Sequence, residues 1–152
     1  MEPKDFIAEV SPFAVESALT TKIPASFVIA EGALESGWGE SRLYREALNM
    51  FGVKADPSWE GPALTMVTRE FIKGTWCVIP ARWRKYSSLA ECIADHAKFF
   101  QTNKRYAGCF TARDGIEFAQ GIAKAGYATD PSYAKKLTSI INEHGLLAYD
   151  HS

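Results

Sequence analysis

The sequence predicts a mostly helical fold of the α+β class that contains one small β-hairpin. Over most of the chain, apolar residues recur three or four positions apart, which is the spacing of one helix face. Capping residues and glycines bound these stretches, and only one segment has the composition of strands. The length of 152 residues and the 47% share of hydrophobic residues fit one core, so we expect a single domain over residues 1–152.

The first part of the chain predicts three helices. Two short ones are expected over residues 5–10 and from Ser11 onward, with Pro12 in the first turn of the second. Phe13, Val15 and Ala18 would supply its apolar positions. A stronger helix starts at Ile23-Pro24 and ends where the glycines of Gly37-Trp38-Gly39 interrupt the apolar pattern.

The middle of the chain predicts a short helix and the hairpin. The helix covers residues 41–48 and ends at the turn Asn49-Met50-Phe51-Gly52. Residues 64–71 and 75–79 are rich in Thr, Val and aromatic residues, and Lys73-Gly74 can turn the chain between them. This hairpin is the only sheet that the sequence indicates.

Three more helices are expected in the last third. Ser88-Leu89-Ala90-Glu91 matches a capping box and opens a helix to about Gln101. Asp114 caps a helix that Gly126 ends, and Asp130-Pro131 begins a last helix that reaches Gly145. The predicted inward residues of the first and last of these helices are Cys92, Ile93, His96, Phe99, Tyr133, Leu137, Ile140 and Ile141.

Composition excludes several function classes. With 17 basic and 18 acidic residues, the chain has no overall charge that would favour nucleic acid as a partner. The three cysteines, Cys77, Cys92 and Cys109, lack metal-ligand spacing, and their odd number cannot form a closed disulfide set. One disulfide is compatible with the sequence, but free buried thiols are favoured. We expect no metal and no cofactor, because no cluster of His and Cys ligands is present.

No secretory signal is visible at the N-terminus, because Met1-Glu2-Pro3-Lys4-Asp5 is not a basic segment followed by an apolar run. No stretch is apolar enough to cross a bilayer, so we expect no membrane insertion. A substrate outside the cytoplasm would then be reached through a holin or secretion machinery. A chain trimmed from a longer periplasmic protein would look the same. We expect a monomer.

Glu35 is the strongest candidate for chemistry. It lies at the end of an apolar helix, directly before Ser36-Gly37-Trp38-Gly39, where glycines let a backbone approach a ligand closely. A carboxyl that Trp38 and Phe51 partly shield would have its ionised form disfavoured and stay protonated near neutral pH. Glycoside cleavage needs such an acid to protonate the leaving oxygen. The alternative is a glutamate that only caps the helix or pairs with a charge.

Several separated motifs resemble glycoside hydrolase family 73, the glucosaminidase domain of flagellar muramidase-like proteins, autolysins and phage endolysins. The motifs run in the family order over nearly the whole chain: residues 23–26, 30–39, 49–55, 81–88, 93–96, 105–106 and 126–133. The resemblance implies a lysozyme-like fold, in which a helical lobe and a small hairpin lobe flank a glycan cleft. It also implies that Glu35 is the general acid.

Further residue roles follow from the same resemblance. Tyr127 matches an active-site tyrosine that positions or stabilises the reacting sugar, and Glu70 on the hairpin matches, more loosely, a second carboxylate. Asp56 and Glu60 in the preceding loop are alternatives to Glu70, and Glu70 can equally be a solvated strand residue.

Glu31 departs from the family, which commonly has glutamine one helical turn before the acid. A second carboxyl there raises the pKa of one member of the pair, so we expect a structural or pKa-tuning role. Ser36, Trp38, Phe51 and Tyr133 are the remaining candidates for substrate binding. Trp38 is favoured as a cleft residue, whereas Phe51 and Tyr133 are expected mainly to hold the lobes together. His96 is interpreted as a satisfied core histidine.

The predicted function is that of an endo-β-N-acetylglucosaminidase that cleaves peptidoglycan between N-acetylglucosamine and N-acetylmuramic acid. The choice of bond rests on the resemblance. A muramidase or lytic transglycosylase on the same scaffold is the nearest alternative, because those reactions also use one glutamate before a Ser-Gly motif. A non-catalytic wall-binding module of a phage or secretion apparatus is an alternative of another class.

Overall fold

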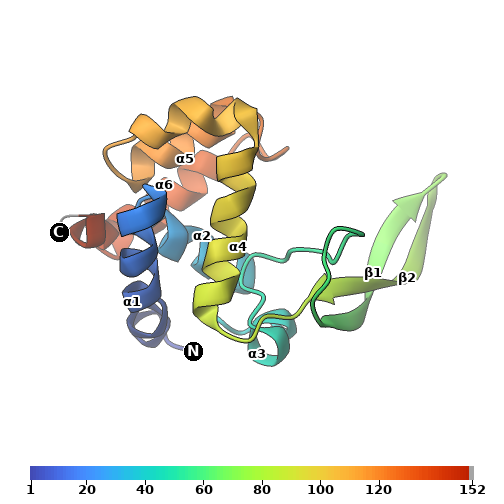
Figure 1. The fold of residues 1–152 in the computed structure, drawn as a ribbon. Helices are drawn as coiled ribbons and strands as arrows, with labels where there is room; N and C mark the ends of the chain where they lie inside the picture. Colours follow the sequence, from blue (N-terminus) through green and yellow to red (C-terminus); the bar gives the residue numbers. More distant parts are fainter. Residues whose placement is uncertain (151–152) are drawn as a thin grey trace.

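The structure, a computed structural model, describes residues 1–150 of the chain. It consists of a helical body and one antiparallel hairpin that projects from it (Figure 1). The elements, in chain order, are α1 (Pro3–Thr21), α2 (Ala25–Ser36), α3 (Arg42–Ala47), β1 (Ala63–Ile72), β2 (Thr75–Arg84), α4 (Leu89–Thr102), the 3₁₀ helix η1 (Lys104–Thr111), α5 (Gly115–Lys124), α6 (Tyr133–Glu143) and the 3₁₀ helix η2 (Leu146–Asp150).

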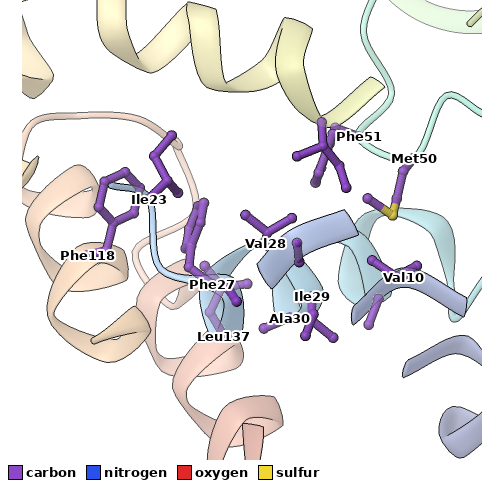
Figure 2. Close-up of a cluster of buried hydrophobic side chains, with 14 of the residues drawn as sticks. Val10, Ile23, Phe27, Val28, Ile29, Ala30, Met50, Phe51, Phe118 and Leu137 are labelled. Atoms are coloured by element: carbon purple, nitrogen blue, oxygen red, sulfur yellow. The ribbon is translucent and has the colours of Figure 1, made fainter. Parts of the chain in front are cut away.

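Helix α2 lies at the centre of the body. Ten of its twelve residues are buried, because α1, α5, α6 and η2 all pack against it. Figure 2 shows its apolar side chains meeting those of the surrounding elements, for example Phe27 with Phe118 of α5, whose ring centroids are 4.7 Å apart. A helix that is apolar all round belongs in a core.

The N-terminal prediction of two short helices is wrong, because α1 is one continuous helix with Pro12 inside it. Proline cannot donate the usual backbone hydrogen bond within a helix. Here Phe6, Val10 and Ala14, each four residues apart, form one buried face that spans the proline, so packing outweighs the lost bond. Phe13, expected on the apolar face, is exposed.

The hairpin is longer than predicted. Ile72 pairs with Thr75 across the turn, where Lys73 and Gly74 both adopt positive φ, 50° and 79°, as a tight two-residue hairpin turn requires. β2 continues past Pro80 to Arg84. In a two-stranded sheet each strand also has a free edge, so a residue without an N–H is tolerated there.

The base of the hairpin is tied to the helical body through Asn49 and Arg84. The buried Asn49 amide donates to the carbonyls of Val53 and Arg84, and its oxygen accepts from the Val53 N–H. The Arg84 guanidinium donates to Asp95 of α4 at 2.7 Å. These bonds fix where the hairpin leaves the body.

The predicted caps of α4 and α5 are confirmed, whereas the predicted start of α6 at Asp130-Pro131 is wrong. Ser88 and Asp114 each accept a hydrogen bond from the backbone N–H three residues on, at the starts of α4 and α5. At α6 the cap residue is Ser132, while the Asp130 carboxylate accepts from the Ser132 N–H. Phe99, expected to point inward, is 43% exposed.

The C-terminal η2 is anchored beneath two helix starts. The Asp150 carboxylate accepts hydrogen bonds from the N–H and the hydroxyl of Ser26 in α2, and from the N–H of Gly115 in α5. The first N–H groups of a helix have no partner within the helix, so one carboxylate here satisfies donors from two helices. Neither η1 nor η2 was predicted.

All three cysteines are free thiols. Cys92 and Cys109 are buried as expected, but Cys77 on β2 is only half-buried. Over residues 1–150, no set of three or more His, Cys, Asp or Glu side chains is grouped to hold a metal ion. No helix in that same range has both the length and the apolarity to span a membrane.

Candidate active site

Glu35 occupies the last turn of α2, where the central helix leaves the core. The residue is exposed, and its carboxylate Oε1 lies 3.1 Å from the Tyr133 hydroxyl at the start of α6. The helix ends at Gly37, whose φ of 57° is the left-handed conformation typical of a C-terminal cap. Glu35 is thus placed at the surface by a helix that cannot itself move within the core.

The Ser-Gly-Trp-Gly segment after Glu35 is a tight left-handed turn. Trp38 and Gly39 follow Gly37 with positive φ of 58° and 82°. Ser36 holds this turn: its buried hydroxyl donates to the Gly32 carbonyl at 2.6 Å and accepts from the Gly39 N–H at 2.9 Å. The motif is therefore explained by backbone geometry, and Ser36 acts as its brace.

Glu31, one turn before Glu35, is completely buried and accepts three hydrogen bonds. Its Oε1 lies 2.6 Å from His96 Nε2, while its Oε2 accepts from the hydroxyls of Tyr127 and Tyr133 at 2.7 and 2.6 Å. The three partners come from α4, the segment after α5, and α6. The structure thereby brings four predicted site residues together, namely Glu31, Glu35, Tyr127 and Tyr133.

The two glutamates have opposite pKa shifts. Burial alone would raise the pKa of Glu31, but the charge of His96 and the hydrogen bonds from His96 and the two tyrosines outweigh it and lower the pKa. The pKa of Glu35 is raised, first by desolvation of its carboxyl and then by the negative charge of Glu31. Glu31 is therefore the member of the pair that ionises first, and Glu35 the one that holds its proton to higher pH.

The tyrosines remain neutral phenols. Burial and the adjacent Glu31 carboxylate raise the pKa of both Tyr127 and Tyr133 far above the ordinary value of a phenol. Each can therefore donate one hydrogen bond and accept others, but neither carries a negative charge at physiological pH.

Phe51 supports the cluster from the side. Its buried ring stacks on the His96 imidazole, with ring centroids 4.1 Å apart and an interplanar angle of 20°. Figure 2 shows Phe51 beside the apolar side chains of α2. Packing fits the expectation that Phe51 holds parts of the fold together.

Trp38 makes its aromatic contacts outside the hydrogen-bonded cluster. Its indole packs on Phe6 of α1 and on His144, with centroid distances of 5.8 and 4.8 Å. Its binding of substrate stays a prediction.

Glu70 lies on β1 of the projecting hairpin. It pairs with Cys77 across the sheet, and its Oε1 is 3.5 Å from Lys54 Nζ. Asp56 instead accepts a hydrogen bond from Arg84 and caps its own loop through Ser58. No hydrogen bond or ion pair among residues 1–150 joins Glu70 or Asp56 to the Glu31 cluster. The loop residue Glu60 is exposed.

His96 is the residue of this cluster whose part sequence reasoning missed. It was interpreted as a satisfied core histidine, and it is indeed hydrogen-bonded, but its partner is the carboxyl next to the predicted acid. The signal was Glu31 itself, because a glutamate on an apolar helix needs a partner when it is buried. A histidine on the buried face of another helix was the available donor.

Comparison with known proteins identifies the family. The profile described as "Glucosaminidase: Mannosyl-glycoprotein endo-beta-N-acetylglucosaminidase" matches residues 11–146 of this chain. The chain belongs to the glucosaminidase family of glycoside hydrolases. The resemblance to family 73 is thereby confirmed, as is the mostly helical, lysozyme-like fold class.

Individual relatives agree with this placement. The peptidoglycan hydrolase FlgJ of Salmonella typhimurium is 40% identical over 146 residues, which are 93% of this chain and 46% of that protein. The exo-glucosaminidase LytG of Bacillus subtilis is 40% identical over 130 residues, 82% of this chain and 45% of that protein. This chain thus spans about half the length of the relatives that it matches.

Solved structures match the fold closely. A C-terminally truncated glycoside hydrolase domain of Salmonella typhimurium FlgJ superposes with a TM-score of 0.85 at 39% identity, covering 95% of this chain and 99% of that one. The catalytic domain of the autolysin Auto from Listeria monocytogenes gives a TM-score of 0.86 at 31% identity, covering 97% and 86% of the two chains.

Proposed function

We propose that this chain hydrolyses the glycan strands of peptidoglycan as an endo-β-N-acetylglucosaminidase, with Glu35 as the general acid. The observation that carries this proposal is the pair of glutamates one turn apart, one buried with a lowered pKa, the other exposed with a raised pKa. Two titratable groups whose surroundings push their pKa values apart are the usual basis for assigning an acid. The bond cut would join N-acetylglucosamine to N-acetylmuramic acid.

Glu35 would protonate the oxygen of the leaving sugar. Protonation removes the need to expel an alkoxide and lets positive charge develop at the anomeric carbon. The exposed position of Glu35 allows a glycan to reach it, and the same position allows water to return the proton after each turnover.

Tyr127 is assigned to the developing positive charge. Its hydroxyl donates to Glu31 Oε2, whose negative charge polarises the phenol oxygen, and the same oxygen lies 3.4 Å from His96 Nε2. A neutral, polarised oxygen stabilises an oxocarbenium-like sugar without forming a strong ion pair with the substrate.

The second group in the reaction is either Glu70, which would activate water, or the 2-acetamido group of the substrate, which would attack the anomeric carbon. Replacement of Glu70 by glutamine distinguishes them. If Glu70 is the base, Glu70→Gln loses at least about 100-fold in kcat. If the acetamido group attacks, the variant keeps most of its activity.

The names of relatives support the substrate. FlgJ is called a peptidoglycan hydrolase, LytG an exo-glucosaminidase, and the family description names an endo-β-N-acetylglucosaminidase. We accordingly propose that the chain acts on the cell wall, as a monomer.

Product analysis tests the choice of bond. Purified peptidoglycan is digested, the products are reduced with borohydride, and mass spectrometry identifies the new ends. N-acetylglucosaminitol ends on oligosaccharides are expected. Muramitol ends would indicate a muramidase, anhydro-muramic ends a lytic transglycosylase, and release of single sugars an exo-acting enzyme.

Glu35→Gln tests the acid. The variant removes the transferable proton but keeps the shape of the side chain, so we expect turnover of a peptidoglycan suspension to fall by about 100- to 10,000-fold. Glu16→Gln, on the exposed middle of α1, is the matched control and should clear the suspension normally. Cosedimentation with peptidoglycan should be unchanged in both. If the wild type binds without clearing, the chain is a binding module instead.

A further inference from the structure

The Tyr133 hydroxyl stands between the two glutamates. Its oxygen is 2.6 Å from Glu31 Oε2 and 3.1 Å from Glu35 Oε1. A phenol has one proton, so Tyr133 can donate to only one of these carboxyls at a time. The other carboxyl then faces a lone pair of the phenol oxygen.

The surroundings of Glu31 decide where this proton goes. Glu31 is fully buried, so its negative charge is stabilised only by hydrogen bonds from the protein. The exposed Glu35 can instead be solvated by water. Tyr133 is closer to Glu31 than to Glu35, and Glu31 is the ionised acceptor. Both facts favour a hydrogen bond that Tyr133 donates to Glu31. The phenol lone pair that faces Glu35 then favours a Glu35 carboxyl that donates its own proton.

His96 is built into this arrangement as the basic partner of Glu31. Its Nε2 is 2.6 Å from Glu31 Oε1, on the oxygen that the tyrosines do not use. Stacking on Phe51 and an edge contact with Phe100, at a centroid distance of 4.9 Å, fix the plane of the imidazole. Among residues 1–150, His96 is the one basic side chain in an ion pair with Glu31.

We propose that His96 is a positioning residue of the reaction: it holds Glu31 as a buried carboxylate, which commits the Tyr133 proton to Glu31 and leaves Glu35 as the carboxyl that keeps its proton. The titratable groups that face Glu31 are His96 from α4, Tyr127 after α5, Tyr133 from α6 and Glu35 from α2. The inference rests on the proposed role of Glu35 as the acid.

Three variants separate charge, hydrogen bond and packing. His96→Leu removes both the donor and the charge. His96→Gln keeps a neutral N–H donor at a similar reach but no charge, so it should restore the wild-type behaviour in part. Glu31→Gln removes the carboxylate with little change of shape, so it keeps the test valid if His96→Leu folds poorly.

The pH profile of kcat/KM is the first measurement. Because Glu35 must be protonated, activity falls as the pH rises through its pKa, and this fall is the basic limb of the profile. Without His96, the buried Glu31 takes up a proton and the Tyr133 proton becomes available to ionised Glu35. We therefore expect His96→Leu and Glu31→Gln to move the basic limb to lower pH, each by about one unit. The double variant should move it no further than Glu31→Gln alone.

A residue that merely packs would lower activity by the same factor at every pH. An unmoved basic limb in a folded His96→Leu protein would therefore overturn the proposal. A limb displaced to higher pH would do so as well, because it would mean that Glu31 stays ionised without His96.

A second measurement does not depend on activity. Carbon-13 NMR of side-chain-labelled glutamate follows the carboxyl titrations in the full chain, and Glu35→Gln assigns the Glu35 signal. The titration midpoint of Glu35 should fall in His96→Leu and in Glu31→Gln and recover in part in His96→Gln. If these midpoints shift while peptidoglycan is not hydrolysed, the proposed function fails and the role of His96 stands. If the midpoints do not shift in an enzyme that hydrolyses peptidoglycan, the role of His96 fails and the proposed function stands.

Discussion

The raised pKa of the Glu35 carboxyl suits proton donation but does not favour the stability of the folded protein at neutral pH. Its pKa is raised above the ordinary 4.5 of a glutamate, so the folded protein resists its ionisation more than the unfolded chain does. The stability that the protonated carboxyl gives is present below the unfolded pKa and is lost as the pH rises through the folded pKa. At pH 7 the wild type therefore lacks this contribution.

A neutral isostere should recover it. We expect Glu35→Gln to unfold at a higher temperature than the wild type at pH 7, by about 1–3 °C, since solvent screens a charge at an exposed residue. The difference should shrink as the pH falls through the raised pKa of Glu35 and disappear below about 4.5, where the wild-type carboxyl is protonated in both states. Calorimetry from pH 4 to 8 checks this. Glu16→Gln is the control, and an equal gain there would remove Glu35 from the explanation.

At this same scale, the sequence identified Glu35 as the proposed acid but not the contact between its neighbour Glu31 and His96. Glu35 and Tyr127 were identified from motifs, and both lie in or beside the Glu31 cluster. The contact between Glu31 and His96 joins residues 65 positions apart, so no local pattern could indicate it. Trp38 was assigned to the cleft because of its type, and its ring packs on Phe6 of α1 and on His144.

Among the elements, the hairpin differs from the helices because it projects from the helical body and is not packed within it. Alternate residues on one of its faces are apolar yet exposed, including Val67, Phe71, Trp76 and Val78. Figure 1 shows both strands extending beyond the helical body. Side chains on this face contribute to the folded state chiefly through their cross-strand neighbours, such as Phe71 and Trp76 at a centroid distance of 5.2 Å.

A matched pair of substitutions compares how much the hairpin face and the core each contribute to the free energy of unfolding. Val78→Thr, at a residue that is 66% exposed, should change the free energy of unfolding by less than about 0.5 kcal/mol. Val10→Thr, at a residue with no exposed surface, places a hydroxyl in the core and should destabilise by about 1–3 kcal/mol. Urea denaturation gives both values. Equal losses would show that the hairpin face is packed in solution.

Elements with strong end signals were predicted well, and elements without them were not. Ser88, Asp114 and Lys73-Gly74 placed α4, α5 and the hairpin turn, because caps and positive-φ turns are local features. α1 was divided at Pro12 since only tertiary packing carries the helix through a proline. η1 and η2 carry no periodic signal, being held by contacts with distant helices.

At the scale of the whole molecule, segments that are far apart in the sequence meet at the start of the central helix α2. Gly115 of α5 packs directly on the start of α2, where Ser26 is itself fixed by Asp150. A Cβ on Gly115 would lie 2.0 Å from Ser26 Oγ and 2.6 Å from the Phe27 backbone nitrogen. Neither atom is the free end of a flexible side chain, so the helices would have to separate.

Gly115→Ala should therefore lower the free energy of unfolding by about 1–3 kcal/mol. Gly108→Ala is the matched control, because an added Cβ there meets no atom within 4 Å and φ is not positive. It should be neutral or stabilise by up to about 1 kcal/mol. Denaturant unfolding gives the free energy of unfolding of both variants. A Gly115→Ala protein as stable as the wild type would contradict the tight contact between α2 and α5.

The burial of α2 has a consequence for how this protein can change over generations. Glu35 is positioned by α2, which packs against α1, α5, α6 and η2, whereas the hairpin is joined to the helical body at its base, through bonds such as those of Asn49 and Arg84. Insertions and new side chains in the hairpin leave Glu35 where it is. Natural variation in specificity, and libraries made to alter it, should therefore concentrate in the strands and their turn and leave the central helix alone.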